Sequence, residues 1–427
     1  MFKLFKNRDF LCLFSGRFIT NLGDSIYSVA AMWLVYELTK SSFYTGIAGA
    51  LILLPSIFEF LVGPLVDRWK LKSILVNTQI SQALLISIIP IGYFLDFLNV
   101  WLVIVVMFLV TCIEQFVYPA QNAALPKILD KEELVAGNSL MTFAYQGTDL
   151  VFIGLSGLII SLIGVINVYI IDVFTFLAAT IIFRLIKFQT NTQDERDNTE
   201  LGTEKIIKNS FKSYLSELNE GKNYVINSII PKILIPITVV NFIFGMITAI
   251  MPEHSFNVGG ELYYGYFLAI MSVAMLLGTL LANLFSEKPL GIMTISSFFL
   301  ASVFWFGSFL IKTPVLSLML FGLAFIPISL INVLIVSTLQ GIIPENLLGR
   351  VFAWYSSIAA LFVPLGSFVG GVASSMTEVA NIYGLGGLGL LIISLYWMFY
   401  PLLRRIPSPT KINPKEYGFH TGKDLQA

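Results

Sequence analysis

Apolar residues dominate the chain in long, nearly uninterrupted runs that short polar segments separate. A helix that crosses a bilayer needs roughly 20 mostly apolar residues, because lipid offers no partner to an unpaired backbone amide or carbonyl. Twelve runs meet this length, so we expect an all-α membrane protein with twelve transmembrane helices. Their approximate bounds are 10–36, 43–66, 73–95, 100–119, 138–163, 166–186, 231–252, 263–285, 291–311, 314–337, 351–375 and 380–403.

Basic residues are distributed unevenly between the two sides of these spans. An even number of spans puts both termini on one side, and 23 of the 26 Lys and Arg residues fall in the loops and termini of that side, against only Lys40 and Lys312 on the other. Cytoplasmic loops are enriched in Lys and Arg, so we expect both termini in the cytoplasm and the chain in the plasma membrane. The first run is too long for a cleaved signal peptide and no small-residue cleavage site follows it, which favours a signal anchor.

A single long polar stretch, 188–230, divides six spans from six. It begins NTQDERDNTELGTEK and becomes amphipathic, with Ile207, Phe211, Tyr214, Leu215 and Leu218 at helical spacing. We expect a cytoplasmic linker with a helix on the membrane surface, and a solvated tether without further function is the alternative. The predicted domains are a six-helix bundle at 1–187, the linker at 188–230, a second six-helix bundle at 231–403 and a cytoplasmic tail at 404–427.

The two halves resemble each other. LPKILDKEELVAGNSL, starting at Leu125, leads into the fifth span, and LQGIIPENLLGRVFAW, starting at Leu339, leads into the eleventh, about 213 residues later. A glycine cluster follows each segment, at Gly154 and Gly157 and at Gly366, Gly370 and Gly371. This repetition predicts two pseudo-symmetric six-helix bundles, an arrangement in which many secondary transporters place a substrate site between the repeats near the midplane.

Composition excludes several classes of protein. Of 427 residues, 56% are hydrophobic and only 12% are charged, whereas soluble domains carry about a quarter charged residues. The 26 basic and 26 acidic residues cancel, so the chain has no excess of positive charge that would indicate binding to nucleic acid. Cys12 and Cys112 lie in apolar runs and favour neither a disulfide nor a metal site. No catalytic or nucleotide-binding fingerprint is present, so we expect a protein that is not an enzyme and holds no metal or cofactor.

A charged motif follows the second span. GPLVDRWKLK runs from Gly63, and in it glycine permits close packing, Asp67 can accept hydrogen bonds from a neighbouring helix N-terminus, and the basic residues face the anionic leaflet. It resembles the loop signature G-x-x-x-D-R-x-G-R-K of the major facilitator superfamily. The resemblance implies that the core Gly63, Asp67 and Arg68 latches the two halves in the outward-open state. Lys70 and Leu71 depart from the usual glycine and basic residue.

Three further segments narrow this resemblance. YPAQNAALPKIL from Tyr118, ELNEG from Glu217 and IPENLLGRVFAW from Ile343 are similar to the branch that holds the bacterial macrolide-efflux and enterobactin-exporter proteins. That resemblance implies a major facilitator fold that exports a small amphiphilic drug or secondary metabolite at the expense of the proton gradient. It also implies a monomer whose partners are this small amphiphile, protons and membrane lipids. The alternatives are a lipid or glycolipid flippase, a proton-independent facilitator, and a membrane sensor that transports nothing. The fifth span lacks the proline of the family's antiporter signature, and the fourth lacks its common arginine.

The first span carries a polar stripe. At 100° per residue, Arg17, Asn21, Asp24 and Ser28 fall within about 60° of one another on an otherwise apolar helix. Charged residues inside a membrane helix cost roughly 2.5–3.5 kcal/mol each, so this face is expected to look onto water or protein. We expect Asp24 to bind a proton or a cation, with Arg17 favouring its charged form, and a static hydrogen-bonded seam between helices is the alternative.

Other ionisable residues extend the candidate site. Asp149 lies near the middle of the fifth span, which holds no basic residue to pair with it, so we expect an unpaired carboxylate that binds and releases a proton. Glu114 lies nearer the cytoplasmic end of the fourth span, with Tyr118 and Gln121 on the same face. Glu59 and Arg350, at the cytoplasmic ends of the second and eleventh spans, are inner-gate candidates.

The remaining polar residues are weaker candidates. Asp172 is expected to be structural, because in this superfamily the sixth span lies outside the cavity, and His254 at the outer end of the seventh span is expected to be solvated. The seventh and tenth spans, which line the cavity in this superfamily, carry amides, a hydroxyl and aromatic rings that favour an amphiphile over a sugar. These residues are Asn241, Ser329, Asn332, Phe242, Phe244 and Phe325.

Overall fold

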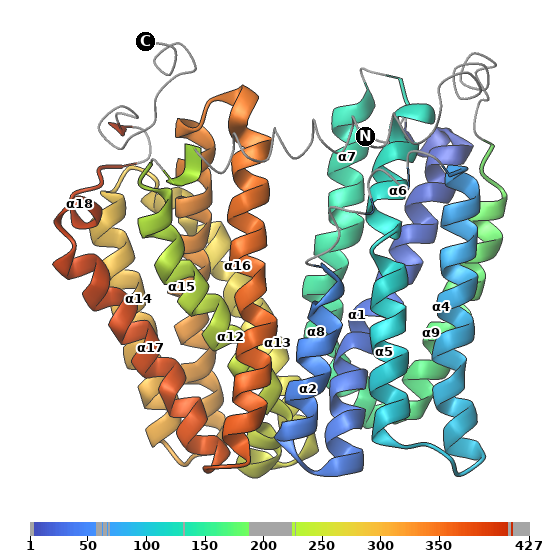
Figure 1. Cartoon of the computed structure of the whole chain (residues 1–427), viewed down its shortest axis with the longest axis horizontal. Coiled ribbons are helices and arrows are strands. Elements are labelled where there is room, and N and C mark those ends of the chain that lie inside the picture. Colours follow the sequence, from blue (N-terminus) through green and yellow to red (C-terminus); the bar gives the residue numbers. More distant parts are fainter. Residues whose placement is uncertain are drawn as a thin grey trace.

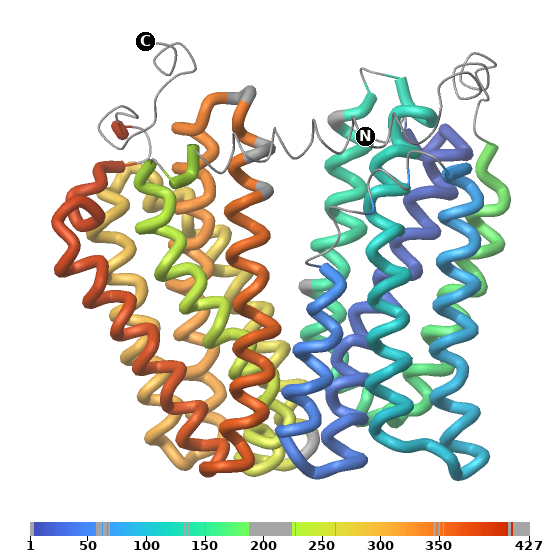
Figure 2. The backbone as a smooth tube through the Cα atoms, viewed as in Figure 1, coloured from blue at the N-terminus to red at the C-terminus, as the bar shows by residue number. Residues whose placement is uncertain are grey.

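The computed structural model describes residues 4–56, 62, 66, 69–130, 133–187, 224–226, 228–408 and 411–412. Every regular element within these residues is a helix, because lipid requires each backbone amide and carbonyl to be paired within its own segment. Figure 2 shows two groups of helices side by side, one from each half of the chain. The predicted all-α architecture of two six-helix bundles is confirmed.

The first group holds the spans of the amino-terminal half. Its helices are α1 (Arg8–Thr39), α2 (Ser42–Leu53), α4 (Leu71–Phe94), α5 (Val100–Glu114), α6 (Val117–Ala124), α7 (Leu134–Thr142), α8 (Thr148–Ile163) and α9 (Val165–Arg184). Within it α1 packs against α8 and α9, and α4 packs against α5 and α9. The helix α1 is therefore central to this half.

The second group holds the spans of the carboxyl-terminal half. Its helices are α12 (Ile230–Gly259), α13 (Glu261–Ala282), α14 (Leu290–Leu310), α15 (Pro314–Ile342), α16 (Glu345–Ser374), α17 (Val379–Phe399) and the short α18 (Pro401–Arg404). Here α15 packs against α13 and α14, and α17 packs against α12 and α14.

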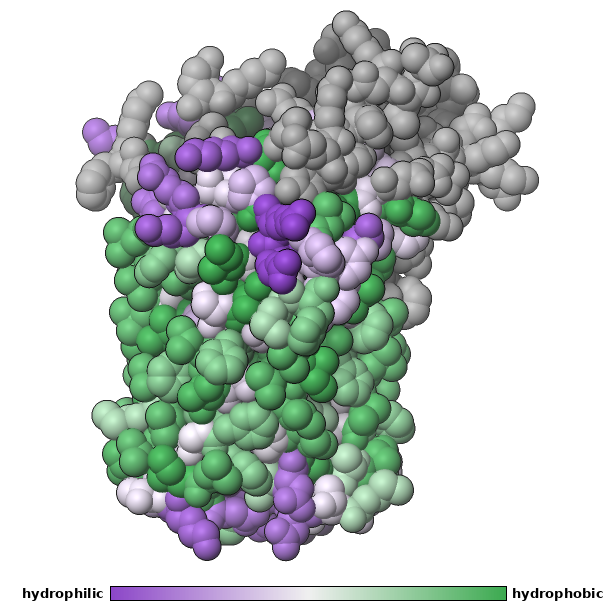
Figure 3. All heavy atoms as spheres, turned by 90° about the vertical axis from the view of Figure 1, so that its left-hand side faces the viewer, coloured by the Kyte–Doolittle hydropathy of each residue, from purple (hydrophilic) through white to green (hydrophobic). Residues whose placement is uncertain are grey.

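Ten spans among the described residues are long and apolar enough to cross a membrane, with α5–α6 and α7–α8 each forming one. The helix α1, whose polar stripe lowers its hydropathy, and α2, whose described part has 12 residues, account for the other two of the twelve expected spans. Figure 3 shows a broad apolar band between hydrophilic ends, the pattern of a surface that faces acyl chains.

Two of the predicted spans are interrupted. The fourth breaks at Gln115 and Phe116, between α5 and α6, because Pro119 has no amide hydrogen and its ring collides with the carbonyl four residues earlier. In the fifth, the segment Phe143–Gly147 between α7 and α8 is a π-helical turn. Such turns are rare and are frequently found at functional sites.

A glycine-rich seam joins the two halves at the face opposite the termini, where the two groups converge (Figure 1). There α2 packs against α16, and α8 packs against α13. A Cβ on Gly46 would lie 2.5 Å from the Cα of Gly371, and a Cβ on Gly157 would overlap the Cα of Gly265, so only glycine lets these backbones touch. Gly157 and Gly371 belong to the two glycine clusters that recur in the sequence.

Hydrogen bonds reinforce this seam. The backbone amide and the hydroxyl of Ser42, at the start of α2, donate to Glu253 Oε2 on α12 over 3.0 and 2.7 Å. The Thr45 hydroxyl donates to the carbonyl of Ala249. Because these bonds cross between the halves, the seam is closed at this face, and the two groups diverge toward the face that carries the termini (Figure 1).

Several predicted features lie outside the described residues. These are the latch residues Gly63, Asp67 and Arg68, the gate candidate Glu59, and the amphipathic segment of the linker. Arg350 lies in α16, and its side chain is also outside the description. Their roles stay predictions.

Candidate functional site

A cavity of about 850 Å³ lies between the two halves. Pockets of roughly 300–1,000 Å³ are typical of small-molecule sites, so this space suits a drug-sized ligand. Both halves contribute to its walls. Its charged and amide lining residues are Arg17, Asn21, Asp24, Glu114, Gln115, Asp149, Asn241 and Asn332.

The polar stripe of α1 forms part of the amino-terminal wall, and all four of its residues line the cavity. Arg17 Nη1 lies 3.7 Å from Asp24 Oδ2, and Arg17 Nη2 donates to Asn21 Oδ1 over 2.6 Å. The side chain of Arg17 is 5% exposed and that of Asp24 is 15% exposed. Arg17 is therefore held in place by the protein, while Asp24 keeps contact with the cavity.

Asn21 connects α1 to the fifth span. Its Nδ2 lies 2.7 Å from the carbonyl oxygen of Tyr145, 2.5 Å from Thr148 Oγ1 and 2.9 Å from Asp149 Oδ1. An amide carries only two donor hydrogens, so these three acceptors compete for them. A small movement of α1 against α8 would change which acceptor is satisfied.

The π-helical turn presents Tyr145 to Arg17. The guanidinium carbon of Arg17 lies 4.0 Å from the centre of the Tyr145 ring, a cation–π contact, and Arg17 Nε has no hydrogen-bond partner among the described residues. The Tyr145 hydroxyl donates to Gln121 Oε1 on α6. Tyr118 packs edge-on against Tyr145, with the ring centroids 5.1 Å apart. The contacts thus run from α6 through the π turn to α1.

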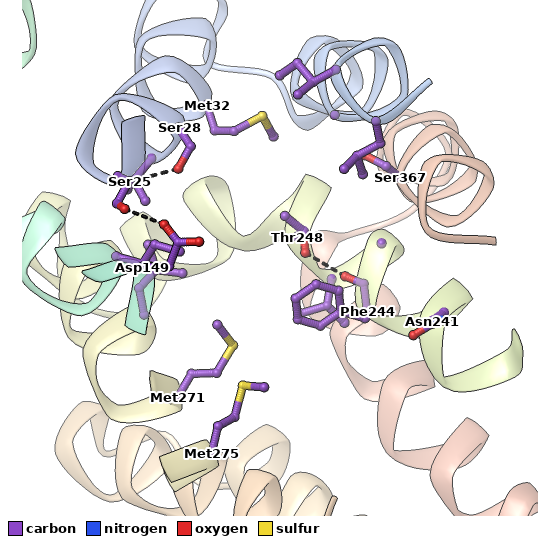
Figure 4. Close-up of a pocket in the computed structure, with 18 of the residues that line it drawn as sticks. Ser25, Ser28, Met32, Asp149, Asn241, Phe244, Thr248, Met271, Met275 and Ser367 are labelled. Atoms are coloured by element: carbon purple, nitrogen blue, oxygen red, sulfur yellow. Dashed lines mark hydrogen bonds between the residues drawn. The ribbon is translucent and has the colours of Figure 1, made fainter. Parts of the chain in front are cut away.

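Asp149 has more partners than the sequence suggested. The prediction that no basic residue of its span pairs with it did not consider neutral donors. Its Oδ1 accepts hydrogen bonds from Asn21 Nδ2 over 2.9 Å and from Ser25 Oγ over 2.5 Å, the second of which Figure 4 shows. Both donors come from α1, a helix far away in the sequence, which is why the fifth span alone did not reveal them. No Lys or Arg forms an ion pair with Asp149 in the described part of the chain. Its charge is therefore stabilised only by neutral donors.

Glu114 also lines the cavity, at the end of α5. The amino-terminal wall thus carries three carboxyl groups, on Asp24, Asp149 and Glu114, and one guanidinium, on Arg17. Such a wall attracts cations and provides groups that can bind and release protons.

The carboxyl-terminal wall carries no charged side chain among the described lining residues. Phe244, Met271 and Met275 line this wall together with Asn241 and Thr248 (Figure 4). Methionine is flexible and polarisable, so such a wall can adapt to ligands of different shape.

Most of the polar groups on this wall also hold the helices together. Asn241 Nδ2 donates to the carbonyl of Ala359 on α16 over 2.9 Å, and Ser329 Oγ donates to the carbonyl of Met275 over 2.7 Å. Phe325 and Asn332 line the cavity as expected. Phe242 is not among the lining residues, and its carbonyl instead packs on Gly366 of α16.

Two of the weaker candidates are buried away from the cavity. Asp172 is 1% exposed, lies between α9 and α1, and does not line the cavity. The expectation that His254 is solvated is wrong, because its ring is 7% exposed and stacks on Tyr383 with the centroids 4.0 Å apart. The cause is the length of α12, which continues past the predicted end of the span and carries His254 into the packing with α17.

Sequence reasoning missed three residues of the site: Ser25, Tyr145 and Thr148. Ser25 borders the stripe on α1, but it was not included there. The polar run Tyr145–Asp149 inside an apolar span was a usable signal, whereas the π turn that aims Tyr145 at Arg17 has no evident sequence signature. No group of three or more His, Cys, Asp or Glu side chains in the described ranges could hold a metal ion.

Known proteins resemble this chain in sequence and, separately, in fold. In sequence, the chain is 25% identical to the uncharacterized MFS-type transporter YkuC of Bacillus subtilis over 415 residues, which cover 93% of this chain and 94% of that protein. It is 24% identical to macrolide efflux protein A of Streptococcus pyogenes over 402 residues, covering 90% and 94%. The crystal structure of the nucleoside transporter NupG matches the fold with a TM-score of 0.67 at 11% identity, covering 95% of this chain and 99% of that one.

The family model of the Major Facilitator Superfamily matches residues 13–367, which include the cavity-lining helices α1, α5, α8 and α12. The resemblance inferred from the sequence motifs, including that to macrolide-efflux proteins, is confirmed. A cavity between two repeated six-helix bundles is where many secondary transporters place their substrate site. The chain is thus a multi-pass membrane protein that belongs to the major facilitator superfamily of transporters.

Proposed function

We propose that this chain exports a small amphiphilic drug or secondary metabolite from the bacterial cytoplasm by proton antiport with alternating access. The observation that carries the proposal is the cavity, which combines an apolar, methionine-rich wall with three carboxyl groups set against one guanidinium. An amphiphile with a cationic group suits both walls. The similarity to macrolide efflux protein A supports the same class of substrate.

The carboxyl groups supply the exchange that antiport needs. A proton on Asp24 or Asp149 neutralises the wall, and its release restores a charge that attracts a cationic substrate, so the two ligands compete for one site. Arg17 and Asn21 join the two carboxyls through contacts at 3.7 and 2.9 Å. Loading one carboxyl therefore changes the electrostatic environment of the other.

The seam supports an arrangement open to the cytoplasm. With the chain in the plasma membrane and both termini in the cytoplasm, as the basic residues favour, the glycine contacts close the outer side. Gly63, Asp67 and Arg68 then act as the latch of the opposite, outward-open state, and Glu59 and Arg350 belong to the inner gate.

The test uses everted membrane vesicles with an acidic lumen and erythromycin or tetraphenylphosphonium as the probe. An antiporter moves the probe in and protons out, so a pH-sensitive dye should report alkalinisation of the lumen. Asp24→Asn and Asp149→Asn should each abolish this response. Asp96→Asn, in the exposed turn after α4, is the matched control and should behave as the wild type.

Three outcomes would contradict the proposal. If both Asp24→Asn and Asp149→Asn still alkalinise the lumen when the probe is added, neither carboxyl carries the exchanged proton. Probe movement without a gradient would indicate a facilitator. Absence of flux with any amphiphile would favour a sensor.

A further inference from the structure

The helix α1 has a second functional face, on the side that packs against α9. Gly23 lies on that face, directly before Asp24, and a Cβ there would overlap Asp172 Oδ1 of α9. Only glycine therefore allows the Asp172 carboxyl to approach α1 so closely. One residue of α1 contacts Asp172, and the next lines the cavity.

Asp172 is poorly satisfied in this position. Its Oδ1 accepts from the Thr175 hydroxyl over 3.1 Å, but that hydroxyl also lies 2.8 Å from the backbone carbonyl of Asp172 and has one hydrogen to donate. Its Oδ2 is buried and has no hydrogen-bond partner among the described residues. No ion pair described for the chain includes Asp172, so nothing balances a negative charge there.

Two tyrosine hydroxyls in the same region also lack partners. Tyr27 on α1 and Tyr169 on α9 pack edge-on, with the ring centroids 5.4 Å apart, and the hydroxyl oxygens of both are buried and without a hydrogen-bond partner in the described part of the chain. Tyr169 lies one turn before Asp172, and Tyr27 lies one turn after Asp24. Tyr27 also lines the cavity, so its side chain borders both the cavity and the contact between α1 and α9.

Neither tyrosine hydroxyl donates to Asp172 Oδ2, so no described donor stabilises a negative charge on that atom. A charged carboxylate buried without a cation costs several kcal/mol, and protonation removes that charge.

We propose that Asp172 is a second proton-holding carboxyl, on the side of α1 that faces away from the cavity. Its contribution to coupled transport rests on the proposed antiport, but its protonation does not.

The titratable groups near Asp172 are few. Asp24 and Tyr27 lie on α1 and Glu114 on α5, and α9 itself carries Tyr169 and, at its last residue, Arg184. The packed helix α4 carries only Lys72 and Tyr93 as titratable groups, near its two ends, and α8 carries Asp149, which lines the cavity. Arg17 is paired with Asp24, and no other Lys or Arg of the described residues lines the cavity.

The experiment that tests this proposal is infrared spectroscopy of the full-length protein in detergent at neutral pH. Protonated carboxylic acids absorb at a higher carbonyl frequency than carboxylates, so Asp172→Asn should remove one band of that class. Asp172→Glu should move the band and not remove it, which keeps the test valid if the asparagine variant folds poorly. Asp96→Asn should leave the spectrum unchanged. A band of wild-type intensity in a folded Asp172→Asn variant would overturn the proposal. This measurement needs no substrate, so a failure here is distinguishable from a failure of the antiport proposal.

Discussion

The two walls of the cavity differ in chemistry, although the halves that supply them share a fold. The amino-terminal wall holds Arg17, Asp24, Asp149 and Glu114, and the carboxyl-terminal wall is apolar, with side chains such as Phe244, Met271 and Met275 and without described charge. Repetition of a six-helix unit therefore preserved the packing, seen in the paired glycine contacts of the seam, but not the site. The difference indicates that one half handles charge while the other provides an adaptable surface for the body of the substrate.

The sharpest way to break this asymmetry is to place a cation on the apolar wall. The ammonium group of Met275→Lys should repel a cationic probe and compete with it for the carboxyls of the opposite wall. If the ammonium and the cationic probe approach to several Å at an effective dielectric near 20, their repulsion should weaken binding of the probe by about 3 kcal/mol. Transport of tetraphenylphosphonium should fall by about a hundredfold. Met275→Leu, which keeps the volume, should transport normally. Equal transport by the two variants would mean that the wall does not face the substrate.

The next effect concerns the single guanidinium of the charged wall. Arg17→Met leaves Asp24 without its ion pair and Asn21 without its donor, so we expect the free energy of unfolding to fall by about 3 kcal/mol. Thermal unfolding in detergent measures this as a lower Tm. Arg17→Lys keeps the charge but loses the planar contact with Tyr145, so its Tm should lie between those of the wild type and Arg17→Met. An unchanged Tm in Arg17→Met would show that the cluster adds nothing to stability.

The smallest expected effect lies on the apolar wall. Phe244→Ala removes an aromatic contact in the cavity without touching a titratable group, so KM for an amphiphile should rise about tenfold, for a loss of about 1.4 kcal/mol of binding free energy. The number of protons exchanged per substrate should not change. A change in that ratio would contradict the division of roles between the walls.

Helical periodicity was sufficient to place the stripe on α1. Because 100° per residue is a property of any α-helix, the spacing of Arg17, Asn21, Asp24 and Ser28 put them on one face, and all four line the cavity. The same reasoning could not give the partners of Asp149, since Asn21 and Ser25 reach it from a helix more than a hundred residues away. Whether these groups carry protons stays a prediction.

Local backbone chemistry limited the remaining predictions. The break before Pro119 follows from its missing amide hydrogen, but hydropathy averages over it and predicted one continuous span. The burial of His254 depends on how far α12 continues and on Tyr383 from α17, and neither is visible in the residues around it.

The sequence by itself determined that the chain crosses a membrane, how many times, and that its two halves repeat, because lipid demands long apolar helices whatever their neighbours are. Only the tertiary structure decided that Asp24, Asp149 and Glu114 share one cavity and that Asp172 lies behind it against Gly23. Those relations arise from contacts between helices, which depend on shape complementarity across the bundle and not on the composition of any one span.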